Sequence, residues 1–227
     1  MTHPHNEAPV NPLPPVVVAL FLVLLGVEAV FSLSEMGLVG GRDAVGLRID
    51  YIQRFGFSGQ LFDWMLENNT WPVEHLLRFF SYPFLHGSFY QAAFAMVFVL
   101  AMGKVVVEAM GAIPFVVIFF ASAAVGAVAF GLLSNSPWLI GAYPSAFGLI
   151  GGFSYLLWLR LGAVGAPQLR AFSLIGMLMG IQLVFGLLFG TDDSWIAEIA
   201  GFVTGFALSM VLIPGGWARL LAKLRGQ

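Results

Sequence analysis

Three residues that could take part in chemistry fall within strongly apolar stretches of this sequence. Tyr143 and Ser145 stand two residues apart near the start of one stretch, and Glu198 lies near the start of another. A serine acts as a nucleophile when a base accepts its proton and donors stabilise the oxyanion. An acidic residue in such a stretch marks a functional site by default, and a structural hydrogen bond from Glu198 to Tyr143 is the alternative.

Composition places these residues in a membrane. Of the 227 residues, 59% are hydrophobic and 10% are charged, and a chain of this length cannot bury so much apolar surface in a core of its own. The net charge of −2 argues against nucleic acid as a partner. Cysteine is absent, which excludes disulfides and cysteine-ligated metal, and the histidines lack metal-like spacing. We therefore expect neither a metal nor a cofactor.

Six apolar stretches, each near the ~20 residues needed to cross the hydrocarbon, predict an all-α bundle of six transmembrane helices. They cover residues 14–33, 88–107, 113–133, 141–160, 170–190 and 195–213. The long first loop, about residues 35–80, mixes charges with Phe and Trp and is expected to lie at the membrane surface. The halves show no transporter-like repeat, so we predict one membrane domain over residues 16–213.

The two ends of the chain are predicted to lie outside this domain. Residues 1–15 are Pro-rich without Lys or Arg and are expected to form a disordered N-terminus, whereas residues 214–227 are expected to form a basic tail suited to anionic lipid. With both termini in the cytoplasm, the short cytoplasmic loops and the tail carry the basic residues, as the positive-inside rule requires. They are Lys104, Arg160, Arg170, Arg219, Lys223 and Arg225.

The opposite side has no basic residue in its short loops and carries Asp192 and Asp193. We expect these two carboxylates to cap the N-terminus of the last span, because acidic side chains accept hydrogen bonds from the free backbone amides of a helix start. This topology is typical of a multi-pass protein of a bacterial inner membrane.

Several motifs resemble those of the rhomboid intramembrane serine proteases. Residues 141–151, G-A-Y-P-S-A-F-G-L-I-G, resemble the nucleophile segment G-A-S-G-x-x-F-G-L-L-G, with Tyr143 in the position of the serine. Residues 77–89, L-R-F-F-S-Y-P-F-L-H-G-S-F, resemble the start of the second span of the family. Residues 198–205, E-I-A-G-F-V-T-G, resemble its H-x-x-G-x-x-x-G in the sixth span. The resemblance covers about residues 70–213.

The resemblance also implies that the catalytic machinery is lost. The serine and histidine of the family's dyad correspond to Tyr143 and Glu198, and the histidine and asparagine that assist the oxyanion correspond to Gln91 and Ala95. His86, which ties the first loop down in the family, keeps its residue type. A phenol is a poor acyl acceptor because phenolate leaves readily, and Ala95 offers no hydrogen bond. Proteolysis by the family mechanism is therefore not expected.

Ser145 is the fallback nucleophile. It lies about 200° around a helix from Tyr143, so it should face away from the sixth span. Pro144 suits an irregular first turn that could reposition it, but packing of a small residue against a neighbouring helix is the favoured interpretation.

Four glycines are expected to have structural roles. Gly148 and Gly151 lie in the fourth span, and Gly201 and Gly205 lie in the sixth. Small residues spaced four apart allow transmembrane helices to approach closely, so we expect these glycines to bring the two spans together.

Three functions follow from the resemblance. The first is a pseudoprotease that binds transmembrane segments of client proteins, as inactive rhomboids and the related derlins do. The second is a divergent intramembrane serine endopeptidase that uses Ser145 or Tyr143. The third is a structural subunit of a membrane complex. All three leave the chain in contact with the lipid bilayer.

Overall fold

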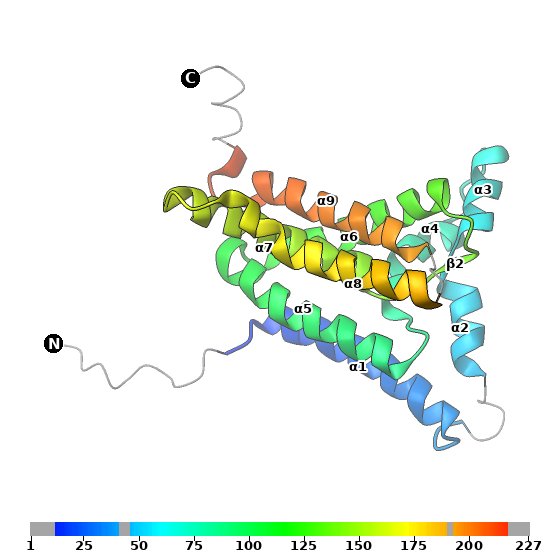
Figure 1. The fold of residues 1–227 in the computed structure, drawn as a ribbon. Coiled ribbons are helices and arrows are strands. Elements are labelled where there is room, and N and C mark those ends of the chain that lie inside the picture. Colours follow the sequence, from blue (N-terminus) through cyan, green and yellow to red (C-terminus); the bar gives the residue numbers. More distant parts are fainter. Residues whose placement is uncertain (1–11, 41–45, 190–192, 218–227) are drawn as a thin grey trace.

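The computed structural model describes residues 12–40, 46–189 and 193–217, which form a bundle of long helices (Figure 1). Among these residues, six helical segments are long and apolar enough to cross a membrane, which confirms the predicted all-α polytopic fold. The long helices are α1 (Pro15–Glu35), α5 (Phe89–Met110), α6 (Ala112–Leu133), α7 (Tyr143–Ala163), α8 (Ser173–Phe189) and α9 (Ser194–Leu212). The 3-10 helix η3 (Gln168–Phe172) precedes α8. Most of the two predicted end segments lies outside the described residues.

The first half of α7 is the centre of the bundle. Each residue from Pro144 to Gly152 is buried, whichever way its side chain points. The helices α5, α6 and α9 pack around it. A helix that is apolar on all sides and enclosed in this way can only be an interior element.

The backbones of α7 and α9 touch directly. A Cβ atom on Gly205 would overlap the backbone of Gly148, and one on Gly201 would overlap the carbonyl group of Pro144. A Cβ atom on Gly151 would overlap the α9 backbone in the same way. Because only glycine leaves room for this approach, these residues set the distance between the two helices.

Short elements of the first loop gather at one end of the long helices, which we call the loop end (Figure 1). They are α2 (Leu47–Phe55), β1 (Phe57–Ser58), α3 (Gly59–Glu67), α4 (Val73–Ser81) and the 3-10 helix η2 (Tyr82–Phe84). The two-residue strand β1 pairs antiparallel with β2 (Trp138–Leu139), which precedes α7. This pairing joins the first loop to the connection that leads into α7.

An aromatic cluster packs the first loop against α6. The ring of Phe57 lies 4.9 Å from that of Phe79 and 5.8 Å from that of Phe62, measured between centroids. The buried hydroxyl of Tyr82 donates to the carbonyl oxygen of Ala123 at 2.9 Å, and burial raises the pKa of Tyr82 well above its usual value. The first loop is thus a packed part of the fold.

Asp193 does not cap α9, so this prediction is wrong. It stands at the cap position, but its side chain makes no capping hydrogen bond. Instead its carboxylate accepts from the Ser134 hydroxyl at 2.8 Å, the Asn135 amide at 3.1 Å and the Ser136 hydroxyl at 3.3 Å. These hydrogen bonds, that of Ser134 foremost, lower the pKa of Asp193. Asp192 lies outside the described residues.

Candidate functional site

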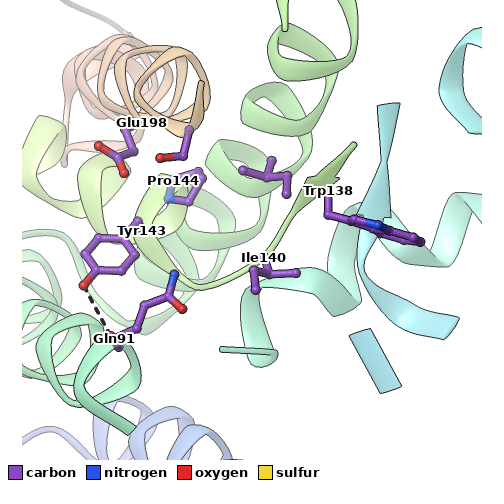
Figure 2. A pocket seen from close by; sticks show the side chains of 8 residues that line it. Gln91, Trp138, Ile140, Tyr143, Pro144 and Glu198 are labelled. Carbon is purple, nitrogen blue, oxygen red and sulfur yellow. Dashed lines mark hydrogen bonds between the residues drawn. The ribbon is translucent and has the colours of Figure 1, made fainter. Parts of the chain in front are cut away.

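A cavity of about 290 Å³ lies at the loop end, where α5, α7 and α9 begin (Figure 2). Its lining residues are Gln91, Trp138, Leu139, Ile140, Tyr143, Pro144, Ser194 and Glu198. The structure thus brings Tyr143, Glu198 and Gln91 together around one space. These are three of the four positions at which the resemblance predicted lost catalytic groups.

Ala95 and Ser145 do not line this cavity. Ala95 is fully buried one turn further along α5 than Gln91. Ser145 is fully buried in α7, and its hydroxyl finds no hydrogen-bond partner among the described residues. Ser145 therefore has no base beside it.

The Tyr143 hydroxyl points toward α5. It donates to the backbone carbonyl oxygen of Gln91 at 3.3 Å (Figure 2). The predicted hydrogen bond between Tyr143 and Glu198 is therefore wrong, although both side chains line the same cavity. The phenol ring packs against apolar residues of α5 and α7, which fixes its direction.

Glu198 is bound by a residue that the sequence analysis missed. Its side chain is buried, and its Oε2 atom accepts a hydrogen bond from Nε2 of Gln182, in α8, at 2.6 Å. A carboxylate in an apolar span is costly unless polar groups surround it, and Gln182 supplies one. The signal was present in the sequence, because Gln182 is the one amide side chain in residues 173–189.

Ser194 is a second lining residue that the sequence analysis missed. It precedes Glu198 by four residues in α9, so both side chains lie on one face of the helix. A hydroxyl thus stands near the carboxylate at the position of the dyad.

Gln91 uses its side chain to hold the start of α5. Its Oε1 atom accepts from the backbone amide of Gly87 at 2.7 Å. Gly141 lies beside the other end of the same amide group, and a Cβ atom there would stand 3.3 Å from Nε2 of Gln91. Gly141 has φ +93°, which favours glycine because a side chain would be strained at that angle.

His86 joins the first loop to the start of α7. Its Nε2 atom accepts a hydrogen bond from the backbone amide of Ala142 at 3.2 Å, so the ring proton belongs on Nδ1. Burial lowers the pKa of His86 to about 4, which keeps the ring neutral at pH 7. The His86 carbonyl oxygen accepts from Nη1 of Arg48 at 2.6 Å.

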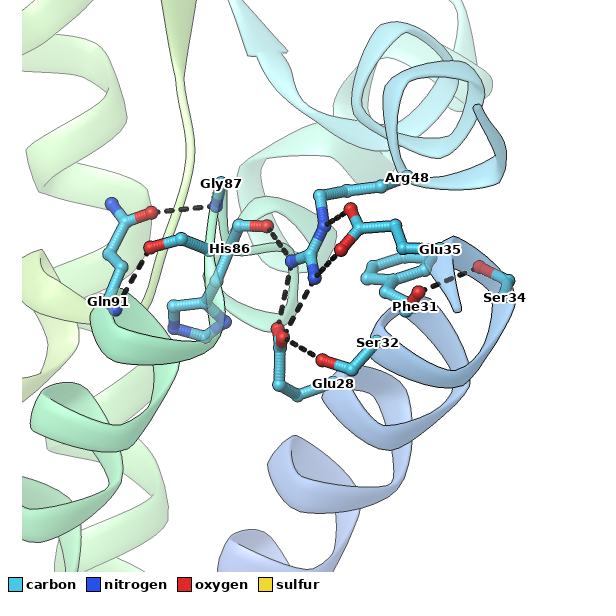
Figure 3. A network of polar contacts seen from close by, with 10 residues as sticks. Glu28, Phe31, Ser32, Ser34, Glu35, Arg48, His86, Gly87 and Gln91 are labelled. Atoms are coloured by element: carbon cyan, nitrogen blue, oxygen red, sulfur yellow. Dashed lines mark hydrogen bonds and ion pairs between the residues drawn. The ribbon is translucent and has the colours of Figure 1, made fainter. Parts of the chain in front are cut away.

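Arg48 is the centre of an ionic network in which Arg48 and Glu28 are buried and Glu35 is exposed (Figure 3). Its Nη2 atom lies 2.9 Å from Glu28, in α1, and its Nε atom lies 2.6 Å from Glu35. Burial alone would lower the pKa of Arg48, but hydrogen bonds and charges of the two glutamates outweigh burial and raise it. The network was missed, although Glu28 is the one charged residue in the predicted first span. It links α1, α2 and, through His86, the start of α7.

The cavity can exchange hydrogen bonds, but its groups do not form the pair that serine proteolysis needs. Tyr143 is bonded to a backbone carbonyl group, and Glu198 is bonded to an amide. Within the described ranges, no three His, Cys, Asp or Glu side chains gather as metal ligands.

The Rhomboid domain family matches residues 73–215, more than half of the chain. No curated protein matches the chain. The matched residues run from α4 to the end of α9 and include all eight residues that line the cavity. Six apolar helical segments and this match together show an integral, multi-pass membrane protein. The chain therefore belongs to the rhomboid family.

Proposed function

We propose that this rhomboid is a pseudoprotease that binds transmembrane segments of other membrane proteins. One observation carries the proposal: Tyr143 and Glu198, which the resemblance aligns with the serine and histidine of the dyad, line one cavity together. Both are held by hydrogen bonds to neighbouring helices, to Gln91 and Gln182 respectively.

Chemistry argues against cleavage. Acyl transfer needs a nucleophile, a base within hydrogen-bond reach and donors for the oxyanion. The phenol of Tyr143 is a poor nucleophile that already donates to Gln91. Ala95 stands where an oxyanion donor would be and has no polar atom. Binding of a helix requires none of these groups.

We place the proposed binding route between α5 and α8. About two turns along α5 from Gln91, Phe98 packs with Met102 in one cluster with Leu178 and neighbouring residues of α8. One turn nearer the loop end, Phe94 of α5 is 62% exposed. Phe94 of α5 and Leu187 of α8 thus leave apolar surface uncovered, on which a client helix could pack.

The second candidate is an endopeptidase, and Ser194 is the observation that favours it. Unlike the buried Ser145, Ser194 lines the cavity on the same helix face as Glu198. A carboxylate beside a hydroxyl still lacks the imidazole that shuttles the proton in the family mechanism. A structural subunit of a membrane complex is the third candidate.

Photo-crosslinking tests the proposed function. A photoreactive amino acid replaces Phe89 or Phe94, both exposed on α5, or Leu22, an exposed control on α1. In native membranes, the α5 sites should trap discrete membrane proteins, and Leu22 should trap far fewer. Lipid adducts alone at all three sites would contradict client binding and favour the structural subunit.

A further inference from the structure

We propose that Glu198 is the docking point for a hydrogen-bond-donating side chain within the bound transmembrane segment. Gln182 occupies this point while no segment is bound. The inference rests on the proposed function, since it names the feature by which a client segment is chosen.

The first observation is the contact itself. The Gln182 amide donates to Glu198 at 2.6 Å, and this bond joins α8 to α9 at the position of the lost dyad. The donor comes from the helix that borders the proposed binding route.

The second observation is the uneven attachment of α8. Its first half, with Leu174, Leu178 and Met179, packs in the cluster formed with α5, α7 and α9. Its second half leaves large apolar side chains uncovered, and Leu187 is 80% exposed. Gln182 lies where the packed half ends, so its bond to Glu198 draws the less covered half toward the bundle.

The third observation is that Gln182 satisfies this site incompletely. Its Oε1 atom is buried without a hydrogen-bond partner among the described residues. A buried unpaired acceptor destabilises the arrangement in which Gln182 is bonded to Glu198. A donor from a client helix could bind Glu198 in place of Nε2, and the displaced amide would then be free to turn Oε1 toward a partner.

The charge of the cavity lining and the depth of Glu198 in the bundle indicate which side chain the client segment should carry and where. The cavity lining contains one acidic residue, Glu198, and no lysine or arginine. When ionised, the Glu198 carboxylate only accepts hydrogen bonds, so it suits amide or ammonium donors. Glu198 is the fifth residue of α9, about 6 Å from its first residue along the helix axis. In the client helix, the matching donor should lie one to two turns from the terminus that is nearest the loop end.

The test uses synthetic single-span peptides and the full-length protein in phosphatidylethanolamine–phosphatidylglycerol vesicles. The peptides share a Leu/Ala core of about 20 residues, the length that spans the hydrocarbon. They carry Asn, Lys or Leu at the fifth core position, or Asn at the centre. A photoreactive amino acid at position 94 reports binding, and one at position 22 reports background. The terminal-Asn peptide should crosslink about three to ten times more than the Leu peptide, as expected for one interhelical hydrogen bond in a bilayer.

Three variants assign the preference to Glu198. Glu198→Leu should reduce the crosslinking of the peptide with Asn at the fifth core position to the level of the Leu peptide. Glu198→Gln, nearly the same shape, should keep the preference for Asn and lose any additional preference for Lys. Gln182→Leu should raise crosslinking of the Asn peptide and leave that of the Leu peptide unchanged. Gln168→Leu is the matched control, because Gln168 also donates from a partly buried amide, to Trp158 at 3.1 Å.

The outcomes separate the two proposals. Equal crosslinking of the Asn and Leu peptides above background would overturn docking at Glu198 and leave client binding intact. A preference for Asn that persists in Glu198→Leu would also overturn it. No adduct of any peptide at position 94 above position 22 would overturn both proposals.

Discussion

The hydroxyl of Tyr143 donates to the backbone carbonyl oxygen of Gln91 at 3.3 Å, across the gap between α7 and α5. Tyr143 therefore joins two helices. The same contact turns the phenol away from Glu198, which bonds to Gln182 in α8. Tyr143 and Glu198 are thus each bound to a different neighbouring helix.

Tyr143→Phe should lower stability slightly. It removes one hydrogen bond and keeps the ring in place, so we expect a loss of about 0.5–1.5 kcal/mol. Thermal unfolding in detergent measures this loss. Tyr155→Phe is the control on the same helix, since that ring packs on Phe206 at 5.5 Å. An unchanged Tm for Tyr143→Phe would show that the long hydrogen bond contributes nothing.

The purified protein should not cleave a single-span rhomboid substrate in liposomes, and it should not react with a fluorophosphonate probe. The reason is that the resemblance aligns Tyr143 with the nucleophile and Ala95 with an oxyanion donor, and neither side chain suits that role. Ser145→Ala and Ser194→Ala are measured in parallel. Cleavage that vanishes in one of them would identify that serine as the nucleophile and contradict the pseudoprotease proposal.

Removing Arg48 should be strongly destabilising. Arg48→Ala leaves the buried carboxylate of Glu28 without its partner, and breaking a buried ion pair in this way costs about 3–5 kcal/mol. Arg54→Ala, at an exposed position of the same helix, should stay within about 0.5 kcal/mol of the wild type. Similar unfolding midpoints for the two variants would refute the structural importance of the network.

Protonation of His86 should weaken the fold as the pH falls. Its pKa is about 4 in the folded protein against 6.5 for the free side chain, so the unfolded state binds the proton more readily. Stability from this residue is complete above pH 6.5 and is lost progressively between pH 6.5 and 4, up to about 3 kcal/mol. Unfolding measured at pH 7 and pH 4.5 should show a smaller difference in stability for His86→Gln than for the wild type.

Gly205→Ala should disrupt the contact between α7 and α9. The added methyl group would overlap the backbone of Gly148, which cannot move aside as a flexible side chain could, so we expect a loss of about 1–3 kcal/mol or more. Gly176→Ala, in α8, is the matched control, because a Cβ atom there meets nothing within 4 Å. Equal stability of the two variants would contradict the close approach of the helices.

The sequence was sufficient to predict the six transmembrane spans, because hydropathy over about 20 residues is a local property. It also placed Tyr143, Glu198 and Gln91 near one another through the motifs that contain them. It did not reveal their partners. Tyr143 and Glu198 were paired because both can hydrogen-bond, but the direction of each side chain depends on the packing of a third helix.

The same limit explains the other omissions. Glu28 and Arg48 are 20 residues apart in sequence and form an ion pair only after the first loop folds back on α1. Asp193 had the residue type and position of a cap, yet Ser134 and its neighbours, nearly 60 residues earlier, offered the better donors. Such choices depend on tertiary geometry, which local patterns do not contain.

The glycine contact between α7 and α9 has a consequence for protein engineering. Because backbone touches backbone there, the spacing between positions 143 and 198 does not depend on the side chains that occupy them. Residues chosen for another reaction, such as two imidazoles, could be installed at these positions without redesigning the helices that carry them.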